Sequence, residues 1–183
     1  MPQVTELLGA ASRGDAGALD RLFEALYADL RQLAHARLRK SPNATLLDTT
    51  SLVHESYLRF LKIGELRIVD QPHFFAYAAR VMRSIVVDFI RQRMADRRGG
   101  GAANITLNTS IADSTPGRED EVLRIHEALE ELATIDERLV RVVEMRYFAG
   151  MNEDEIALAL GTSVRTVSRD WEKARLFLFA SLK

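Results

Sequence analysis

The sequence predicts an all-α protein: two small helical domains joined by a flexible linker, with a helix-turn-helix in the second. Nearly every segment places apolar residues at helical spacing, and no segment shows the alternation of a strand. A run rich in Gly, Asn, Ser and Thr interrupts this pattern once. The 183 residues, 47% of them hydrophobic, can fill one ordinary domain or two small ones. The expected division is residues 1–98, a linker at 99–117, and residues 118–183.

Helix breakers and caps set the boundaries expected in the first domain. Gly14 ends a short helix, and the Ser-Pro-Asn sequence at residues 41–43 ends a longer one. Gly64 stops a third helix that starts at Asp48 or Thr49. Proline fits the first turn of a helix, so Pro72 marks the start of a fourth. These helices are expected at residues 5–12, 16–40, 49–63 and 72–98.

The second domain carries the sharpest local pattern. Helices are expected at residues 118–133 and 136–148, the latter ended by Gly150. Asn152 with Glu155 three residues later resembles a capping box, which starts a helix that reaches Leu160.

Gly161 ends this short helix, and Ser163 caps the next one, which starts at Val164. A helix, a glycine-containing turn and a second helix form the helix-turn-helix pattern.

Apolar spacing predicts which face of this motif is buried. Ile156, Ala157 and Leu160 should pack against Val167 and Trp171. The opposite face can then enter a major groove and contact bases and phosphates. The alternative is a helical hairpin whose basic face is only solvated. The candidate DNA-binding residues of this motif are Ser163, Arg165, Thr166, Ser168, Arg169 and Lys173.

Charge is segregated along the chain, although the net charge is only −1. Residues 80–98 carry +4, residues 113–155 carry −8, and residues 161–183 carry +3. Two basic segments suggest two anion-binding surfaces, with nucleic acid the leading ligand, although each can be a solvated helix face. The candidate DNA-binding residues of the first segment are Arg80, Arg83, Arg91, Arg93, Arg97 and Arg98.

Composition argues against several other classes. The chain has no cysteine, which excludes disulfides, thiolate zinc sites and a cysteine nucleophile, and which suits the cytoplasm. Its four histidines have no partner at helical spacing for a metal site, and no phosphate-binding loop follows the glycine run. We therefore expect no metal, no cofactor and no enzymatic activity. No apolar run is long enough to suggest a membrane span.

Three segments resemble bacterial RNA polymerase sigma factors of the extracytoplasmic-function (ECF) class. They are LVHESYLRFLK at residues 52–62, HFFAYAARVMRSIVVDFIRQRMADRRGGG at residues 73–101, and LVRVVEMRYFAGMNEDEIALALGTSVRTVSRDWEKAR at residues 139–175. The resemblance implies polymerase core as partner, through its clamp helices and flap. It also implies promoter DNA, with melting and −10 recognition by the first domain and −35 recognition by the second. The details resemble a sub-group often found beside Ser/Thr protein kinases.

Two other functions compete with this interpretation. One is a helix-turn-helix regulator that binds an operator without polymerase, and the other is a helical adaptor, such as an anti-sigma-like partner, with no role on DNA. The segment LVHESYLRFLK and the basic helix after it distinguish a sigma factor from a simple regulator, which needs neither.

The start of the third helix departs from the family pattern. ECF factors usually carry acids just before the LV-x-E segment, whereas this chain has Asp48, Thr49, Thr50 and Ser51 there. Aligned on this segment, the missing acids fall at Thr50 and Ser51. The simpler interpretation is a helix cap followed by neutral hydroxyls. The alternative is that a Ser/Thr kinase restores the negative charge by phosphorylation. Thr50 is then the leading candidate, and Ser51 and Thr49 are weaker ones. The candidate polymerase-binding residues are Asp48, Thr49, Thr50, Ser51, Leu52, Val53, Glu55 and Arg59.

Overall fold

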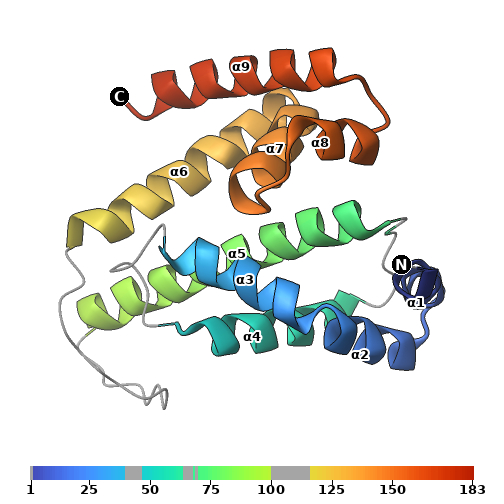
Figure 1. Cartoon of the computed structure of the whole chain (residues 1–183). Helices are drawn as coiled ribbons and strands as arrows, with labels where there is room; N and C mark the ends of the chain where they lie inside the picture. Colours follow the sequence, from blue (N-terminus) through green and yellow to red (C-terminus); the bar gives the residue numbers. More distant parts are fainter. Residues whose placement is uncertain (1, 40–46, 64–67, 69, 100–115) are drawn as a thin grey trace.

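Every regular element among the described residues is helical, which confirms the predicted all-α class. The computed structural model describes residues 2–39, 47–63, 68, 70–99 and 116–183 (Figure 1). The N-terminal half comprises α1 (Pro2–Ser12), α2 (Ala16–Ala25), α3 (Tyr27–Arg39), α4 (Thr49–Ile63) and α5 (Gln71–Gly99). The C-terminal half comprises α6 (Pro116–Ile135), α7 (Glu137–Val143), the π-helical turn η1 (Glu144–Phe148), α8 (Glu153–Ala159) and α9 (Val164–Ser181).

The helix expected at residues 16–40 is two helices. Leu26, with φ −104° and ψ 8°, ends α2, and α3 starts at the next residue. The break turns the chain so that α2 packs against α1 while α3 packs against α4 and α5. Leu26 and Leu30 are both buried at the bend, so the apolar stripe changes direction without a polar interruption. Helical period alone does not reveal such a break, because both helices keep the same spacing.

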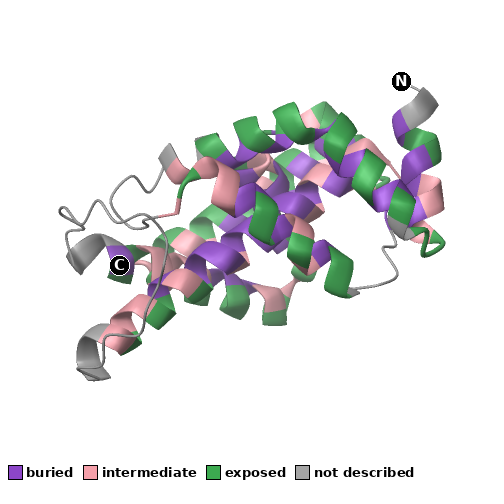
Figure 2. Ribbon diagram, turned by 90° about the horizontal axis from the view of Figure 1, so that it is seen from below, coloured by how far each residue is buried: buried purple, intermediate pink, exposed green. Residues whose placement is uncertain are grey.

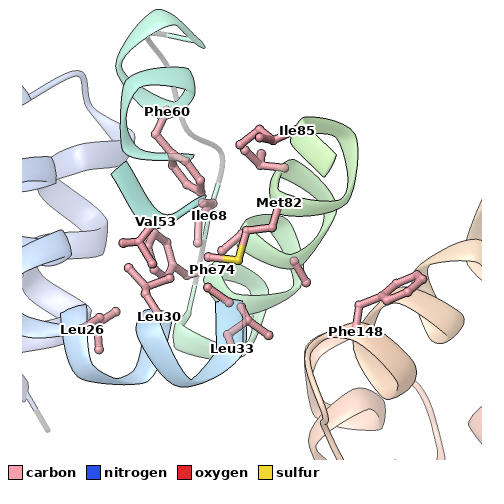
Figure 3. Close-up of a cluster of buried hydrophobic side chains, with 14 of the residues drawn as sticks. Leu26, Leu30, Leu33, Val53, Phe60, Ile68, Phe74, Met82, Ile85 and Phe148 are labelled. Atoms are coloured by element: carbon pink, nitrogen blue, oxygen red, sulfur yellow. The ribbon is translucent and has the colours of Figure 1, made fainter. Parts of the chain in front are cut away.

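Three aromatic rings fill the centre of the N-terminal half. Phe23 of α2, Phe60 of α4 and Phe74 of α5 have ring centroids 5.1 to 5.8 Å apart. Edge-on and tilted contacts of this kind stabilise a core beyond the area they bury. Figure 3 shows Phe60 and Phe74 converging between the helices, with Leu30 beside them. This core fixes α4 against α5, and so positions the candidate residues on both helices.

The helix expected at residues 136–148 is continuous, but its last turn is wider than an α-helix. Asp136 caps α7 by accepting the Arg138 N–H at 2.9 Å. At the other end the Ala149 N–H donates to the Glu144 carbonyl, five residues back, at 3.0 Å. Gly150, with φ +70°, then ends the element as expected. A π-helical turn is uncommon and often lies at a functional position.

The two halves pack against each other along α5. This helix contacts α6, η1 and α8. Figure 1 shows α6 to α9 on one side of α5, and Figure 2 shows the buried residues gathered in the middle of the molecule. One continuous cluster of buried residues spans both halves, and it includes Phe148 of η1, which Figure 3 shows beside α5. α5 extends to Gly99 and α6 starts at Pro116, so both helices enter the predicted linker. The rest of that linker, residues 100–115, lies outside the described residues.

Candidate functional surfaces

The predicted helix-turn-helix forms from the residues expected to start and stop its helices. The Asn152 side chain accepts the Glu155 N–H at 2.9 Å, and the Glu155 carboxylate accepts the Asn152 N–H at 2.8 Å. This confirms the capping box at the start of α8. Gly161, with φ +60°, makes the turn in a conformation that favours glycine. Ser163 then caps α9 by accepting the Thr166 N–H at 3.2 Å.

Apolar contacts hold α8 and α9 together as predicted. Ile156 and Ala157 of α8 are buried in one cluster with Val167 of α9, and Leu160 and Trp171 pack against it. The inner face of α9 is therefore committed to the core of the motif. Its basic residues lie on the opposite face.

The outer face of α9 is polar and exposed near its N-terminus. Arg165, Arg169 and Lys173 are exposed, and no acid among the described residues forms an ion pair with any of them. A nearby phosphate would meet cations whose charge is not already neutralised. Of the other candidates, Ser168 is exposed, Thr166 is half-buried, and the Ser163 hydroxyl serves as the cap.

A buried acid, which the sequence pattern did not predict, fixes α9 to α7. Asp170 is 1% exposed, and its carboxylate lies 2.8 Å from Nε and 3.1 Å from Nη2 of Arg138. Asp170 follows Val167 by three residues and precedes Ala174 by four, so helical spacing places it on the inward face. An acid on the inward face of this helix was the sequence signal for such an ion pair, because a buried charge needs a partner.

The arginines of α5 do not share one face. Arg80 and Arg91 are exposed, although an Arg80 nitrogen lies 4.0 Å from the Glu137 carboxylate of α7. The Arg93 side chain is only 17% exposed and lies 3.3 Å from Glu119 of α6, which is itself buried. The side chains of Arg97 and Arg98 lie outside the described residues.

Arg83 lies between the two halves rather than on a surface open to DNA. It is 4% exposed. Its Nη1 lies 2.6 Å from Nδ1 of His126, and its Nη2 lies 2.8 Å from the Glu144 carboxylate and 3.6 Å from that of Glu130. The expectation that Arg83 faces DNA is therefore not met in this arrangement. Its spacing places it on the face of α5 that packs against the C-terminal half.

The environment of this cluster shifts two pKa values. Burial raises the pKa of the Glu144 carboxyl, against the opposing effect of Arg83. Burial, together with the charge of Arg83, lowers the pKa of His126. His126 can thus accept a hydrogen bond from Arg83 through a neutral ring nitrogen. The sequence signal for Glu144 is an acid inside the apolar run LVRVVEM.

The start of α4 is a helix cap with two further hydroxyls. Asp48 accepts the Ser51 N–H at 2.9 Å and the Ser51 hydroxyl at 2.8 Å. The backbone N–H of Ser51, and then its hydroxyl, lower the pKa of Asp48, so this carboxylate is ionised at neutral pH. Of the two expected caps, Asp48 is the one that forms. The hydroxyls of Thr49 and Thr50 bond to no described residue, and both side chains are partly exposed.

The other candidate polymerase-binding residues divide between the core and the surface. Leu52 and Val53 are fully buried, so they stabilise the N-terminal half and are not available to a partner. Glu55 is exposed, and Arg59 binds Asp88 at 2.6 Å and Ser84 at 2.8 Å across the gap to α5. A groove of about 360 Å³ lies here between α4 and α5. It is lined by Leu47, Ser51, Glu55, Arg59, Ile85, Asp88, Phe89 and Gln92.

The described residues form neither a membrane-spanning helix nor a cluster of metal ligands. None of the helices there is long and apolar enough to cross a bilayer. No group of three or more His, Asp or Glu side chains in the described part of the chain is arranged to hold a metal ion.

These features define a class of protein: an all-α chain with a capped C-terminal helix-turn-helix and a second basic helix. A family model described as "ECF sigma factor" matches residues 1–183, so the chain belongs to the ECF sigma factor family. Members are alternative sigma factors, which bind RNA polymerase core and promoter DNA to initiate transcription. This membership favours an initiation factor over a regulator that acts without polymerase.

Comparison with individual proteins adds a structural resemblance. No curated protein sequence matches the chain. A solved structure titled "Structure of CnrH in complex with the cytosolic domain of CnrY" is similar, with 23% sequence identity and a TM-score of 0.42. The similarity covers 98% of this chain and 97% of that chain.

Proposed function

We propose that the two halves of this sigma factor have separate roles at the promoter. The N-terminal half binds polymerase core through α4 and contacts the −10 element and the melted DNA through α5. The C-terminal half reads the −35 element through α9 and contacts the polymerase flap. The observation that carries the proposal is the outer face of α9, where the arginines are exposed and the opposite face is committed to the core.

In the C-terminal half, the start of α9 is suited to entry into a major groove. Arg165 and Arg169 lie one helical turn apart on the exposed side, so both can reach the same groove. An arginine can bind the guanine edge through two hydrogen bonds, whereas Lys173, further along the helix, suits a phosphate contact. Asp170 supports this role indirectly, because its pairing with Arg138 fixes the rotation of α9.

In the N-terminal half, the groove between α4 and α5 is the proposed polymerase contact. Ser51, Glu55 and Arg59 line it from one helix, and Asp88 lines it from the other. The exposed carboxylate of Glu55 suits basic clamp helices, which the family resemblance implies, whereas Asp88 is already paired with Arg59. Among the described side chains of α5, Arg80 and Arg91 are the exposed cations, and they are the proposed backbone contacts to promoter DNA.

We further propose that phosphorylation of Thr50 by a Ser/Thr kinase strengthens polymerase binding. Thr50 lies in the first turn of α4, where free N–H groups and the helix dipole favour a negative group. The Ser51 hydroxyl already bonds to Asp48, while that of Thr50 bonds to no described residue, so Thr50 is the easier hydroxyl to modify. A phosphate adds a charge of about −1.5 to −2 at neutral pH, close to that of two acids.

Transcription in vitro tests both proposals together. We expect polymerase core with kinase-treated protein to transcribe a cognate promoter, and core with unmodified protein to transcribe it weakly. The Thr50→Ala variant should fold normally and stay weak after kinase treatment, because the Asp48 cap does not involve the Thr50 side chain. A tenfold difference in core affinity requires only about 1.4 kcal/mol, which charge-assisted hydrogen bonds to clamp arginines can supply.

Two controls separate the outcomes. Thr49→Ala removes the neighbouring hydroxyl and should respond to the kinase like the parent. Thr50→Glu should restore activity only in part, since a carboxylate carries one charge and fewer acceptor oxygens. Equal core affinity of phosphorylated, unmodified and Thr50→Ala protein at two salt concentrations would leave Asp48 and its neighbours as a cap only. No transcription by any form would refute the initiation role itself.

A further inference from the structure

The contact between the halves contains a buried ion pair on the helix that is proposed to bind DNA. The Arg83 guanidinium of α5 reaches across to Glu144 of η1 at 2.8 Å and to His126 of α6 at 2.6 Å. The side chains of both Arg83 and Glu144 are 5% exposed. The pair is thus desolvated, and it joins two segments that are far apart in the sequence.

This ion pair is incompletely satisfied. Nε of Arg83 is buried without a hydrogen-bond partner. A buried donor without a partner lowers the stability of the state that contains it, because the same group is hydrated when exposed. Buried ion pairs stabilise a fold weakly in net terms, and their best-attested role is to select one arrangement over another. The unpaired Nε of Arg83 therefore destabilises the closed packing, and separation of the halves would remove this unfavourable contribution.

Further carboxylates lie along the same side of α5. Glu137 of α7 lies 4.0 Å from Arg80, and Glu119 of α6 lies 3.3 Å from Arg93. Together with Glu144 at Arg83, these acids contact α5 arginines from three elements of the C-terminal half, α6, α7 and η1. They occupy positions where DNA phosphates would otherwise neutralise the same guanidinium groups.

We propose that this closed packing is an autoinhibited state, in which the acidic side of the C-terminal half masks α5 from promoter DNA and the Arg83–Glu144 pair holds it closed. The proposal rests on the DNA-binding role proposed above for α5. Opening exposes Arg83 and releases Arg80 and Arg93 from their acids. The same interface also buries apolar residues such as Phe148, and these favour the closed state until DNA or polymerase binds. Closure and DNA binding by α5 then exclude each other, so DNA and polymerase select the open state.

The distance between the halves tests this directly, because the chain has no native cysteine to interfere with labelling. Cysteines can be introduced at the exposed positions Gln32 of α3 and Glu172 of α9 and spin-labelled. Pulsed electron paramagnetic resonance then measures the distance between the two labels, and so between the two halves. We expect one narrow distribution for the parent, and a broader, longer one for Glu144→Gln. Affinity of that variant for single-stranded −10 DNA should rise by about tenfold, if about one molecule in ten of the parent is open.

Two variants control for charge and folding. Glu131→Gln removes the same charge from an exposed position of α6 and should change neither measurement. The double variant Arg83→Met with Glu144→Met replaces the pair by apolar side chains of similar length and should stay closed, because such replacements preserve packing. Thermal unfolding monitored by circular dichroism would confirm that every variant folds.

The outcomes separate this proposal from the proposed function. A broad distribution in the parent, or an unchanged one in Glu144→Gln, would refute the closed state. Opening without a gain in DNA affinity would refute masking. Transcription by the holoenzyme is measured independently, so a chain that opens as expected but never initiates would refute the initiation role and leave the closed packing established.

Discussion

Two basic helices, α5 and α9, were expected to contact DNA, and their basic side chains lie in different environments. On α9 the arginines point outward, and the buried charge is Asp170, which binds Arg138 inside the same half. On α5 the buried charge is Arg83, which binds Glu144 of the other half. Helix α9 is fixed within its own half and its cations are exposed, whereas Arg83 of α5 forms an ion pair that joins the two halves. A run of basic residues therefore does not define a DNA surface until each residue is placed on its face of the helix.

The largest effect should come from the buried acid of α9. Arg138→Ala would leave Asp170 charged, buried and unpaired, which we expect to lower the free energy of unfolding by about 3 kcal/mol. The neighbouring Arg141 is the matched control, since among the described residues it pairs only with Glu137, an exposed acid on the same helix. Arg141→Ala should leave the urea midpoint nearly unchanged. Equal midpoints for the two variants would show that Asp170 does not fix α9.

This comparison also shows what the sequence could and could not predict. The capping box at Asn152, the turn at Gly161 and the Ser163 cap depend on residues close in sequence, and all three were predicted and are confirmed. The Arg83–Glu144 contact joins residues 61 positions apart, so no local pattern reveals it. The burial of Leu52 and Val53 was in principle predictable, because they lie on the apolar face of α4.

A smaller effect, on recognition rather than stability, is expected from the exposed side of α9. Arg165→Ala should weaken binding to a −35 duplex by about 1–3 kcal/mol and relax preference at one base pair, if this arginine reads a base edge. Arg175→Ala changes an equally exposed arginine of the same helix three turns further on, and it should bind like the parent. The measurement is the affinity of both variants for a panel of −35 duplexes, each of which carries one base-pair substitution. Parallel losses on every duplex would mean that Arg165 contacts phosphate only.

The smallest expected effect is a pH dependence of the closed packing through His126. Burial, and then Arg83, lowers the pKa of His126 in the closed state, and an exposed histidine titrates near 6.5. The open state therefore binds the proton more readily, so closure is favoured above about pH 6.5 and weakens as the pH falls through that value. Glu144 acts in the opposite direction, since burial raises its pKa in the closed state and its protonation there favours closure. The spin-label distance distribution should broaden between pH 8 and pH 6.

His126→Gln identifies the origin of this broadening, because glutamine keeps a polar partner for Arg83 without titrating. The variant should show the same distribution at both pH values, while His54→Gln, on the exposed side of α4, should retain the parent's response. Other charges also act on the ring, so a response that survives in His126→Gln would assign the titration to a different group. The charged groups that influence His126 are Arg83, Asp88 and Arg91 of α5 and Glu130 of α6. Burial has the largest influence and lowers the pKa of His126. Among the charges, Arg83 and Arg91 lower this pKa further while the halves stay packed, and Glu130 and Asp88 oppose them by favouring the protonated ring.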